Sequence, residues 1–375
     1  MKRIGIIGGG QLGKMMILDG KRLDTVFVIL DPVKNCPAHS IADEHIVAEF
    51  NDVEAIKRLA KKVDVVTYEF EHISLTALRQ LEQDGHIVYP SSETLSHIQD
   101  KYEQKKWLKQ HQLPVPDFIS IENLRALELA EESFGYPMIL KTCTGGYDGK
   151  GNAVIQNRSG MKAAYEALGA GKLPLMAEEY VEFTKEISVL ACRSANGETT
   201  VFPIAENAHV NSILDETIVP AAIDELTKAE ALEAAGQCLK AFHAYGMLCI
   251  ELFVTKDGHV LINELAPRPH NSGHYTIEGC YTSQYEQHIR AILGYPLGNT
   301  DLIRPCAMKN IIGARSAKAE VRGLLTAYSY PNVKIHIYGK EQVSPGRKMG
   351  HLTATGDTRE EALKEVRAAH QAIQF

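Results

Sequence analysis

Residues 261–274 read LINELAPRPHNSGH, an apolar run that meets a glutamate and then enters a loop holding one arginine and two histidines. The preceding segment, 248–256, is also strand-like, and Asp257-Gly258 between the two suits a two-residue hairpin turn. With those residues in the turn, Glu251 stands opposite Glu264 on one face, and their β-carbons are about 4.5–5.5 Å apart. Like charges at that spacing repel, so the pair is protonated, solvated at an edge, or joined by a cation.

This acidic pair has two interpretations. A solvated hairpin face accounts for it without any function. Alternatively, the two acids form a binding site for a hard divalent cation such as Mg²⁺, because such ions bind through carboxylates and substrate phosphates. A three-residue loop would shift the register and separate the two acids. Arg268 and His270, a few residues downstream, favour the site.

Composition excludes several classes of protein. The chain has 375 residues, enough for two or three domains, and its 45% hydrophobic and 23% charged residues are ordinary for a globular protein. The net charge of −7 does not favour binding to nucleic acid or to an anionic membrane. No apolar run approaches the roughly 18 residues of a membrane span. The N-terminus enters a strand without a signal-peptide pattern, and the seven cysteines show no CxxC spacing. We therefore expect a cytoplasmic protein with reduced thiols, no disulfide framework and no zinc site.

The first segments indicate an α/β domain. A buried strand at residues 3–7 leads into a glycine-rich loop, residues 8–13, and a helix to about Leu23, and a second strand ends in Asp31. The loop satisfies G-x-G-x-x-G, which together with the downstream acid is typical of dinucleotide binding. The motif is weak by itself, because any phosphate ester can sit on a helix N-terminus and any closely packed helix can use the glycines.

A further candidate, Glu71, follows the strand at residues 63–68. In an open α/β sheet the carboxyl ends of the strands bind ligands, so Glu71 could accept hydrogen bonds from ribose hydroxyls or an amine. The alternative is an acid that is stabilised by the macrodipole at the start of the next helix. Spacing alone does not separate the two interpretations.

A second glycine-rich loop follows the strand at residues 136–141. Residues 142–152 read TCTGGYDGKGN and lie between two strands, with Lys141 and Lys150 as flanking cations. The free backbone N–H groups and the two lysines suit phosphate oxygens. The loop is not a Walker A motif, because G-x-x-x-x-G-K-[ST] is missing and a strand follows. A flexible hairpin loop is the alternative, and the lysines favour a nucleotide flap.

The rest of the chain predicts an antiparallel run, a long helix and a small β-rich tail. Strand-like segments stand at residues 175–181, 186–192 and 199–205. The helix at 226–244 should bury Leu226, Leu232, Leu239 and Phe242. The tail, 302–375, closes with a helix at 358–373. Within it SPGRKMGH, residues 344–351, is a basic turn that bears on function only if it folds back over the hairpin.

Together these motifs resemble the ATP-grasp superfamily and, within it, the N5-carboxyaminoimidazole ribonucleotide synthetase family of purine biosynthesis. The resemblance covers nearly the whole chain and is most specific in EEYV (178–181), NELAPRPHNSGH (263–274) and GRKMGH (346–351). It implies an α/β protein, α+β overall, with the ATP-grasp fold. The implied domains are a Rossmann-like parallel-sheet domain at 1–98, an ATP-grasp domain at 99–295 with its flap lobe at about 114–181, and a small β-rich C-terminal domain at 296–375 that completes the active site.

The resemblance also implies a reaction. ATP, bicarbonate and 5-aminoimidazole ribonucleotide would give N5-carboxyaminoimidazole ribonucleotide, ADP and phosphate. Bicarbonate is a poor electrophile, and its phosphorylation to carboxyphosphate supplies a good leaving group, so that the amine attacks this species or the CO₂ it releases. Phosphoryl transfer depends mainly on positioning and charge neutralisation, and the site must exclude water because carboxyphosphate hydrolyses.

Finally, the resemblance implies roles for individual residues and a homodimer as the assembly. Mg²⁺, or Mn²⁺ as the alternative, would bind Glu251 and Glu264. Bicarbonate and carboxyphosphate would be held by Arg268, His270 and Lys348. The backbone of 178–181 would read adenine, Glu186 would take the ribose hydroxyls, and the ATP contacts as a whole would be Lys101, Lys141, Gly146, Tyr147, Asp148, Gly149, Lys150, Gly151, Asn152, Glu178, Glu179, Tyr180, Val181, Glu186, His209, Asn263 and Glu264. The ribonucleotide would face Gly10, Gln11, Leu12, Glu71 and Arg347.

Three other functions stay open on the sequence. The formate-using glycinamide ribonucleotide enzyme of the same superfamily would have the same ATP site and a different amine. An NAD-dependent oxidoreductase built on the first glycine loop and Asp31 would leave the acidic hairpin and the flap without a role. A non-catalytic nucleotide-binding protein would be expected to have lost one of the two hairpin acids.

Overall fold

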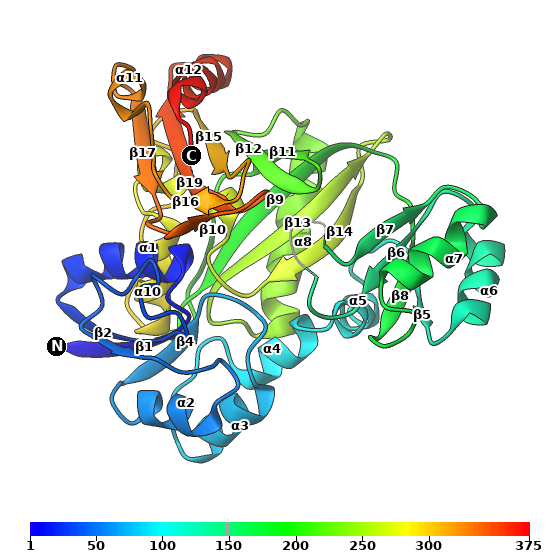
Figure 1. Cartoon of the computed structure of the whole chain (residues 1–375), viewed down its shortest axis with the longest axis horizontal. Coiled ribbons are helices and arrows are strands. Elements are labelled where there is room, and N and C mark those ends of the chain that lie inside the picture. Colours follow the sequence, from blue (N-terminus) through cyan, green and yellow to red (C-terminus); the bar gives the residue numbers. More distant parts are fainter. Residues whose placement is uncertain (147–149) are drawn as a thin grey trace.

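The fold of the chain, a computed structural model, combines three main sheets (Figure 1). The structure describes residues 1–146 and 150–375. Tyr147, Asp148 and Gly149, which the sequence predicts as ATP contacts, lie outside the described residues. In the described part of the chain, a parallel N-terminal sheet and a small antiparallel sheet lie on either side of a long antiparallel sheet.

The N-terminal sheet has the strand order β3-β2-β1-β4. Its elements are β1 (Lys2–Ile7), α1 (Gln11–Gly20), η1 (Lys21–Leu23), β2 (Thr25–Leu30), β3 (Glu44–Ile46), α2 (Val53–Ala60), β4 (Val65–Tyr68), α3 (Leu75–Gln83) and α4 (Ser92–Ile98). Its inner strands are apolar runs because helices cover both faces of a parallel sheet. Asp52, Ser74 and Ser91 begin α2, α3 and α4 by accepting a backbone N–H with their side chains. The carboxyl ends of β1 and β4 therefore meet at one edge, where Gly8 and Glu69 follow them.

The small sheet has the order β5-β8-β6-β7 and carries the flap loop between β6 and β7. Helix α5 leads into this lobe, whose elements are α5 (Lys101–Gln110), β5 (Phe118–Ile121), α6 (Leu124–Phe134), β6 (Met138–Thr142), β7 (Asn152–Ile155), α7 (Arg158–Ala167) and β8 (Leu175–Glu179). Helices α6 and α7 pack on one side of it (Figure 1). At the end of the flap, Gly151 has φ +89°, and a Cβ there would lie 2.3 Å from Thr142 Oγ1. This position therefore requires glycine.

The central sheet has the order β14-β13-β9-β11-β12-β15-β19-β17, and β10 pairs with β9. Its strands are β9 (Phe183–Arg193), β10 (Thr199–Val201), β11 (Ala205–Val210), β12 (Ile213–Val219), β13 (Gly246–Thr255), β14 (Val260–Ala266), β15 (Cys306–Ile312), β17 (Val333–Ile337) and β19 (Lys348–Thr355). The remaining elements are α8 (Glu225–Phe242), η2 (Asn271–Gly273), α9 (Thr276–Gly279), α10 (Gln284–Ile292), β16 (Ala317–Lys318), α11 (Leu324–Ala327), β18 (Gln342–Val343) and α12 (Arg359–Ala372). The strands of the C-terminal tail continue this sheet through the β12–β15 pairing. That continuity fixes the tail relative to the hairpin.

The β13–β14 hairpin pairs Glu251 with Glu264, so this sequence prediction is confirmed, although the predicted turn is wrong. The Thr255 N–H donates to the His259 carbonyl (2.9 Å), which makes the loop three residues long. Such a loop shifts the register, and Leu252 accordingly pairs with Ile262. A bulge that adds Asn263 to β14 then shifts the register back. The two irregularities cancel, and the acids face each other.

Helix α8 buries a different stripe from the one predicted. Leu239 and Phe242 are buried and Leu232 is half-buried, but Leu226 is 82% exposed. The inward face is formed largely by small residues, namely Thr227, Ala231, Ala234, Ala235 and Cys238. Leu226 lies in the first turn, outside that stripe, so the prediction that it packs inward is wrong. Close packing of α8 on β9 and β13 selects small side chains there.

Among the described residues, no helix combines the length and the apolar composition that crossing a lipid bilayer requires. All seven cysteines are buried and unpaired.

Candidate active site

A cavity of about 680 Å³ opens where the N-terminal sheet, the hairpin, the flap and the C-terminal turn meet. It brings together predicted residues from distant parts of the chain, and those in its lining are Gln11, Leu12, Glu71, Lys101, Gly146, Lys150, Glu251, Glu264, Arg268, His270, Arg347 and Lys348. The basic turn at 344–348 lines the same cavity, so it does fold back over the hairpin. The predicted metal and bicarbonate residues all lie in this one space.

A second group of predicted residues does not line this cavity: Gly10, Lys141, Gly151, Asn152, Glu178, Glu179, Tyr180, Val181, Glu186, His209 and Asn263. One contact within this group joins the small sheet to the hairpin. Lys141 Nζ on β6 donates to Asn263 Oδ1 on β14 (3.5 Å). The Glu179 N–H, one of the groups expected to read adenine, donates instead to the Asp117 carbonyl (2.9 Å). Tyr180 and Val181 follow the end of β8. Their contact with adenine stays a prediction.

The two acids of the hairpin have different electrostatic environments. Lys101 forms an ion pair with Glu264, and its charge holds the pKa of the Glu264 carboxyl well below its usual range. Burial, followed by the charge of Glu264, raises the pKa of Glu251. A cation bound beside Glu251 would favour the charged form of this carboxyl and so lower its pKa.

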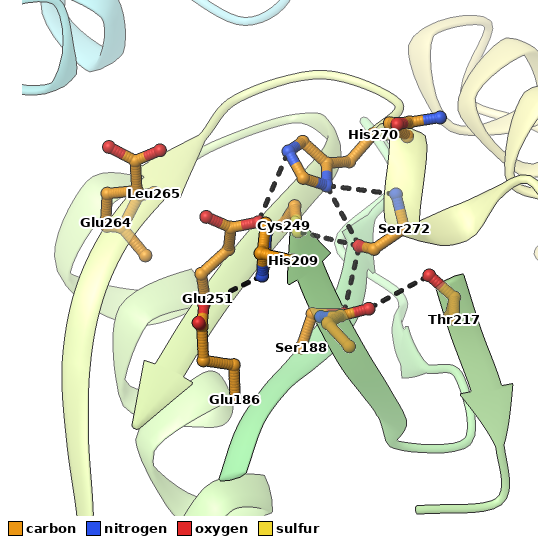
Figure 2. A network of polar contacts seen from close by, with 12 residues as sticks. Glu186, Ser188, His209, Thr217, Cys249, Glu251, Glu264, Leu265, His270 and Ser272 are labelled. Carbon is orange, nitrogen blue, oxygen red and sulfur yellow. Dashed lines mark hydrogen bonds and ion pairs between the residues drawn. The ribbon is translucent and has the colours of Figure 1, made fainter. Parts of the chain in front are cut away.

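His270 is held as a neutral imidazole with a defined proton position. The backbone N–H of Ser272 donates to His270 Nδ1 (3.3 Å), so Nδ1 is an acceptor and the ring proton belongs on Nε2. Nε2 faces Glu251 Oε1 at 3.5 Å (Figure 2). Burial, together with the charges of Arg268 and Lys348, lowers the pKa of His270 well below 6.5. The ring thus offers an N–H to the cavity without carrying a charge.

Arg268 and Glu71 form a two-point ion pair at the other side of the cavity. Arg268 Nε lies 2.8 Å from Glu71 Oε1, and Nη2 donates to Oε2 (3.3 Å). Ser74 is the N-cap of α3, so Glu71 precedes the helix and the helix-terminal interpretation of this acid does not apply. The carboxylate of Glu71 orients the guanidinium, and both side chains line the cavity.

The N-terminal glycine loop is filled by carboxyl groups of the protein itself. Glu69, 9% exposed, accepts the backbone N–H groups of Gly10 and Gly13, and Asp31 accepts that of Gly9 (2.8 Å). These are the donors that a dinucleotide would use for its pyrophosphate. A phosphate placed there would displace Glu69 and meet its negative charge. The structure therefore disfavours the dinucleotide interpretation, and it commits the N–H of Gly10 to Glu69.

We accordingly expect the protein not to bind NADH, because Glu69 and Asp31 already accept the N–H groups of Gly9, Gly10 and Gly13. Titrating the protein into NADH should leave the nicotinamide fluorescence unchanged. A saturable change in that fluorescence at micromolar protein would contradict this assignment and return the loop to a cofactor role.

Sequence reasoning missed several residues that the fold brings to the site. Glu69 stands two residues before the predicted Glu71, and this second acid after the same strand was a usable signal. Lys105 had none, because it is one of four lysines on the polar helix α5. In the structure it is buried, and with Lys141 it forms ion pairs to the carboxylate of Glu178. Lys340 also lines the cavity, from the segment that precedes the basic turn.

Three family models match consecutive parts of the chain. They describe a ribonucleotide synthetase preATP-grasp domain at residues 1–99, an ATP-grasp domain at 106–285 and a phosphoribosylaminoimidazole carboxylase C-terminal domain at 306–365. The N5-carboxyaminoimidazole ribonucleotide synthase of Bacillus subtilis (strain 168) is 42% identical over 363 residues, which cover 97% of this chain and 94% of that protein. This chain belongs to the N5-carboxyaminoimidazole ribonucleotide synthase family.

Solved structures of the family agree with the fold. An ADP complex of an N5-carboxyaminoimidazole ribonucleotide synthetase matches with a TM-score of 0.92 and 43% identity, covering 98% of this chain and 96% of that one. The Aspergillus clavatus enzyme in complex with ADP and 5-aminoimidazole ribonucleotide matches with a TM-score of 0.90 and 33% identity, covering 99% and 98%. The family resemblance and the ATP-grasp fold predicted from the sequence are confirmed.

Proposed function

We propose that this chain is a carbon–nitrogen ligase that carboxylates 5-aminoimidazole ribonucleotide in purine biosynthesis. It uses ATP and bicarbonate, proceeds through carboxyphosphate, and releases N5-carboxyaminoimidazole ribonucleotide, ADP and phosphate. The observation that carries the proposal is the meeting of the acidic pair, the flap and the Arg268–His270–Lys348 group in one cavity. Membership of the family supports the choice of substrates.

The acidic pair fits a divalent cation. Glu251 and Glu264 lie opposite each other, and burial together with the charge of Glu264 raises the pKa of Glu251. Carboxylate oxygens are the ligands that Mg²⁺ prefers, and Mn²⁺ is the alternative. When bound, the ion would neutralise the charge that develops on the ATP phosphates during transfer. Lys101 and Lys150 bring further positive charge to the same cavity.

Arg268, His270 and Lys348 suit a small oxyanion. Arg268 and Lys348 supply two positive charges, and neutral His270 supplies an N–H donor without adding a third. Glu71 holds Arg268 in place through its two-point ion pair. Such preorganised donors stabilise carboxyphosphate and the transition state that leads to it. Phe50 and Phe70 line the cavity nearby and help to exclude water.

The ribonucleotide would occupy the part of the cavity nearest the N-terminal sheet. Gln11 and Leu12 lie in the first turn of α1, between Gly10 and Gly13, and Arg347 lies on the basic turn, where it would approach the substrate phosphate. Arg347 Nη1 donates to the Gln342 carbonyl (2.9 Å), which anchors the guanidinium at the rim. We also propose that the protein acts as a cytoplasmic homodimer, which light scattering on the purified chain would test.

The direct test measures ADP release with Mg-ATP and bicarbonate, with and without fresh 5-aminoimidazole ribonucleotide. Release that depends on the ribonucleotide supports the reaction and the substrate together. Release that depends instead on glycinamide ribonucleotide and formate would replace this proposal by the related formate-using ligase. Absence of ATP binding would remove the ATP-dependent reaction altogether.

Replacing Lys348 by alanine should impair the use of bicarbonate far more than the binding of ATP. Loss of one preorganised cation should lower kcat/KM for bicarbonate by about 100-fold, while KM for ATP stays unchanged. Steady-state ADP release in buffers freed of dissolved CO₂ measures both constants. Lys334→Ala, an exposed lysine on the adjacent strand β17, is the matched control and should change neither. Equal losses for bicarbonate and ATP would place Lys348 on the nucleotide.

A further inference from the structure

A chain of buried polar side chains runs from the interior of the central sheet to the ring of His270 (Figure 2). Thr217 Oγ1 on β12 donates to Asn207 Oδ1 on β11 (3.0 Å), and Asn207 Nδ2 donates to Ser188 Oγ on β9 (3.0 Å). Ser188 Oγ donates in turn to Ser272 Oγ in η2 (2.9 Å), which lies 2.9 Å from His270 Nδ1. Three neighbouring strands thus contribute to one hydrogen-bonded path.

The path has a single direction. Ser272 Oγ accepts the proton of Ser188, so its own proton must point elsewhere. Nδ1 of His270 already accepts the Ser272 backbone N–H, which makes this nitrogen an acceptor for the Ser272 hydroxyl as well. The Ser272 hydroxyl also lies 3.8 Å from Cys249 Sγ, which is a weaker acceptor than Nδ1, so the donors along the chain point toward Nδ1. The ring proton is left on Nε2, on the side of Glu251.

The backbone of His270 is fixed separately from its ring. Gln284, fully buried on α10, accepts the His270 N–H with Oε1 (2.8 Å) and donates to the His270 carbonyl with Nε2 (2.7 Å). The remaining freedom is rotation of the ring about its side-chain bonds. A ring turned over would bring its N–H against the backbone donor of Ser272, and the polar chain opposes that rotation.

We propose that Ser272, Ser188, Asn207 and Thr217 are positioning residues that lock the ring of His270, with Nδ1 inward and the Nε2–H presented to the cavity beside Glu251. The inference rests on the proposed function in one respect, the role of His270 in holding bicarbonate. Ser188, Thr217 and Ser272 are fully buried, so they act through His270 and do not touch substrate. Buried networks of this kind specify one arrangement when every member is satisfied.

A double-mutant cycle tests the proposal with the full-length enzyme. Ser188→Ala should lower kcat for ribonucleotide-dependent ADP release about fivefold to tenfold and leave KM for ATP unchanged. In a His270→Asn background the same substitution should cause no further loss, because the ring that it positions is gone. Equal fold losses in the two backgrounds, or no loss in the wild-type background, would overturn the proposal.

A second pair of variants separates positioning from damage to the sheet. Thr217→Val removes the hydroxyl at the far end of the chain and should lower kcat in the same way. Thr353→Val is the matched control, since this buried threonine on β19 has no hydrogen-bond partner for its hydroxyl among the described residues. The control should retain wild-type kcat. Equal effects of the two valines on kcat would overturn the proposal.

The state of the ring can also be read without turnover. In protein labelled with ¹⁵N-histidine, the signals lost in His270→Asn identify the ring of His270. We expect Nε2 protonated and Nδ1 unprotonated in the wild type. Ser272→Ala keeps the backbone N–H that donates to Nδ1 and removes only the hydroxyl contact, so the tautomer should stay and the Nδ1 resonance should shift. An unshifted Nδ1 resonance in Ser272→Ala would overturn the proposal. This readout needs no substrate. It therefore distinguishes a wrong assignment of the positioning residues from a wrong proposed reaction.

Discussion

Replacing Glu264 by glutamine should reduce ADP release by about 1,000-fold or more, while the protein stays folded. The substitution keeps the shape of the side chain and removes the charge that pairs with Lys101 and would bind the cation. Phosphoryl transfer depends on neutralising developing charge, and single groups that do so contribute about 10³–10⁵ in rate. ADP release at saturating Mg-ATP, bicarbonate and ribonucleotide measures the loss. Far-UV circular dichroism checks that the variant is folded.

The control for this variant is Glu182→Gln. Glu182 forms an ion pair with Lys256, which lies at the exposed tip of the β13–β14 hairpin. This variant should keep wild-type turnover, since surface pairs contribute little and the tip lies away from the cavity. Near-normal turnover of Glu264→Gln would remove the acidic pair as the metal site.

Replacing Glu178 by glutamine should destabilise the protein by about 3–5 kcal/mol, the usual cost of breaking a buried ion pair from one side. The carboxylate of Glu178 is buried and neutralises Lys105 and Lys141, whose side chains are 3% and 9% exposed. With glutamine in its place, two ammonium groups stay in the interior without a counter-charge. Urea unfolding, followed by circular dichroism, measures the change in free energy.

Two further variants give this second prediction its controls. Glu166→Gln removes an exposed carboxylate on α7 of the same lobe and should leave the urea midpoint unchanged. Adding Lys105→Met to Glu178→Gln should recover part of the stability, because it removes one of the two unpaired cations. A single Glu178→Gln variant as stable as the wild type would show that solvent reaches these lysines.

The local pattern of the sequence was enough for most of the elements. Apolar runs predicted the strands of the hairpin, and the helix predicted at 226–244 is α8. Helix α8 shows the limit of this reasoning. A large apolar residue is usually buried, yet Leu226 is exposed because the tight contact with the sheet selects alanines.

The hairpin shows the same limit at the level of register. Asp257-Gly258 predicted a two-residue turn, and the pairing of Glu251 with Glu264 followed from it. The chain instead combines a three-residue loop with a bulge at Asn263. Turn length and bulges depend on the strands packed alongside, here β9 next to β13, so local sequence does not specify them.

By itself the sequence determined which chemistry the protein carries: the acidic pair, the flap, the basic turn and the family to which they belong. The flap and the basic turn are local features, since each depends on residues that are neighbours along the chain, and the two acids belong to one predicted hairpin. Tertiary structure alone decided that Glu69 fills the first glycine loop, that Lys105 and Lys141 share Glu178, and that a polar path reaches His270. Each of these joins residues far apart in the sequence. These contacts form only because the sheets pack together. The hydrophobic periodicity of the sequence does not predict that packing.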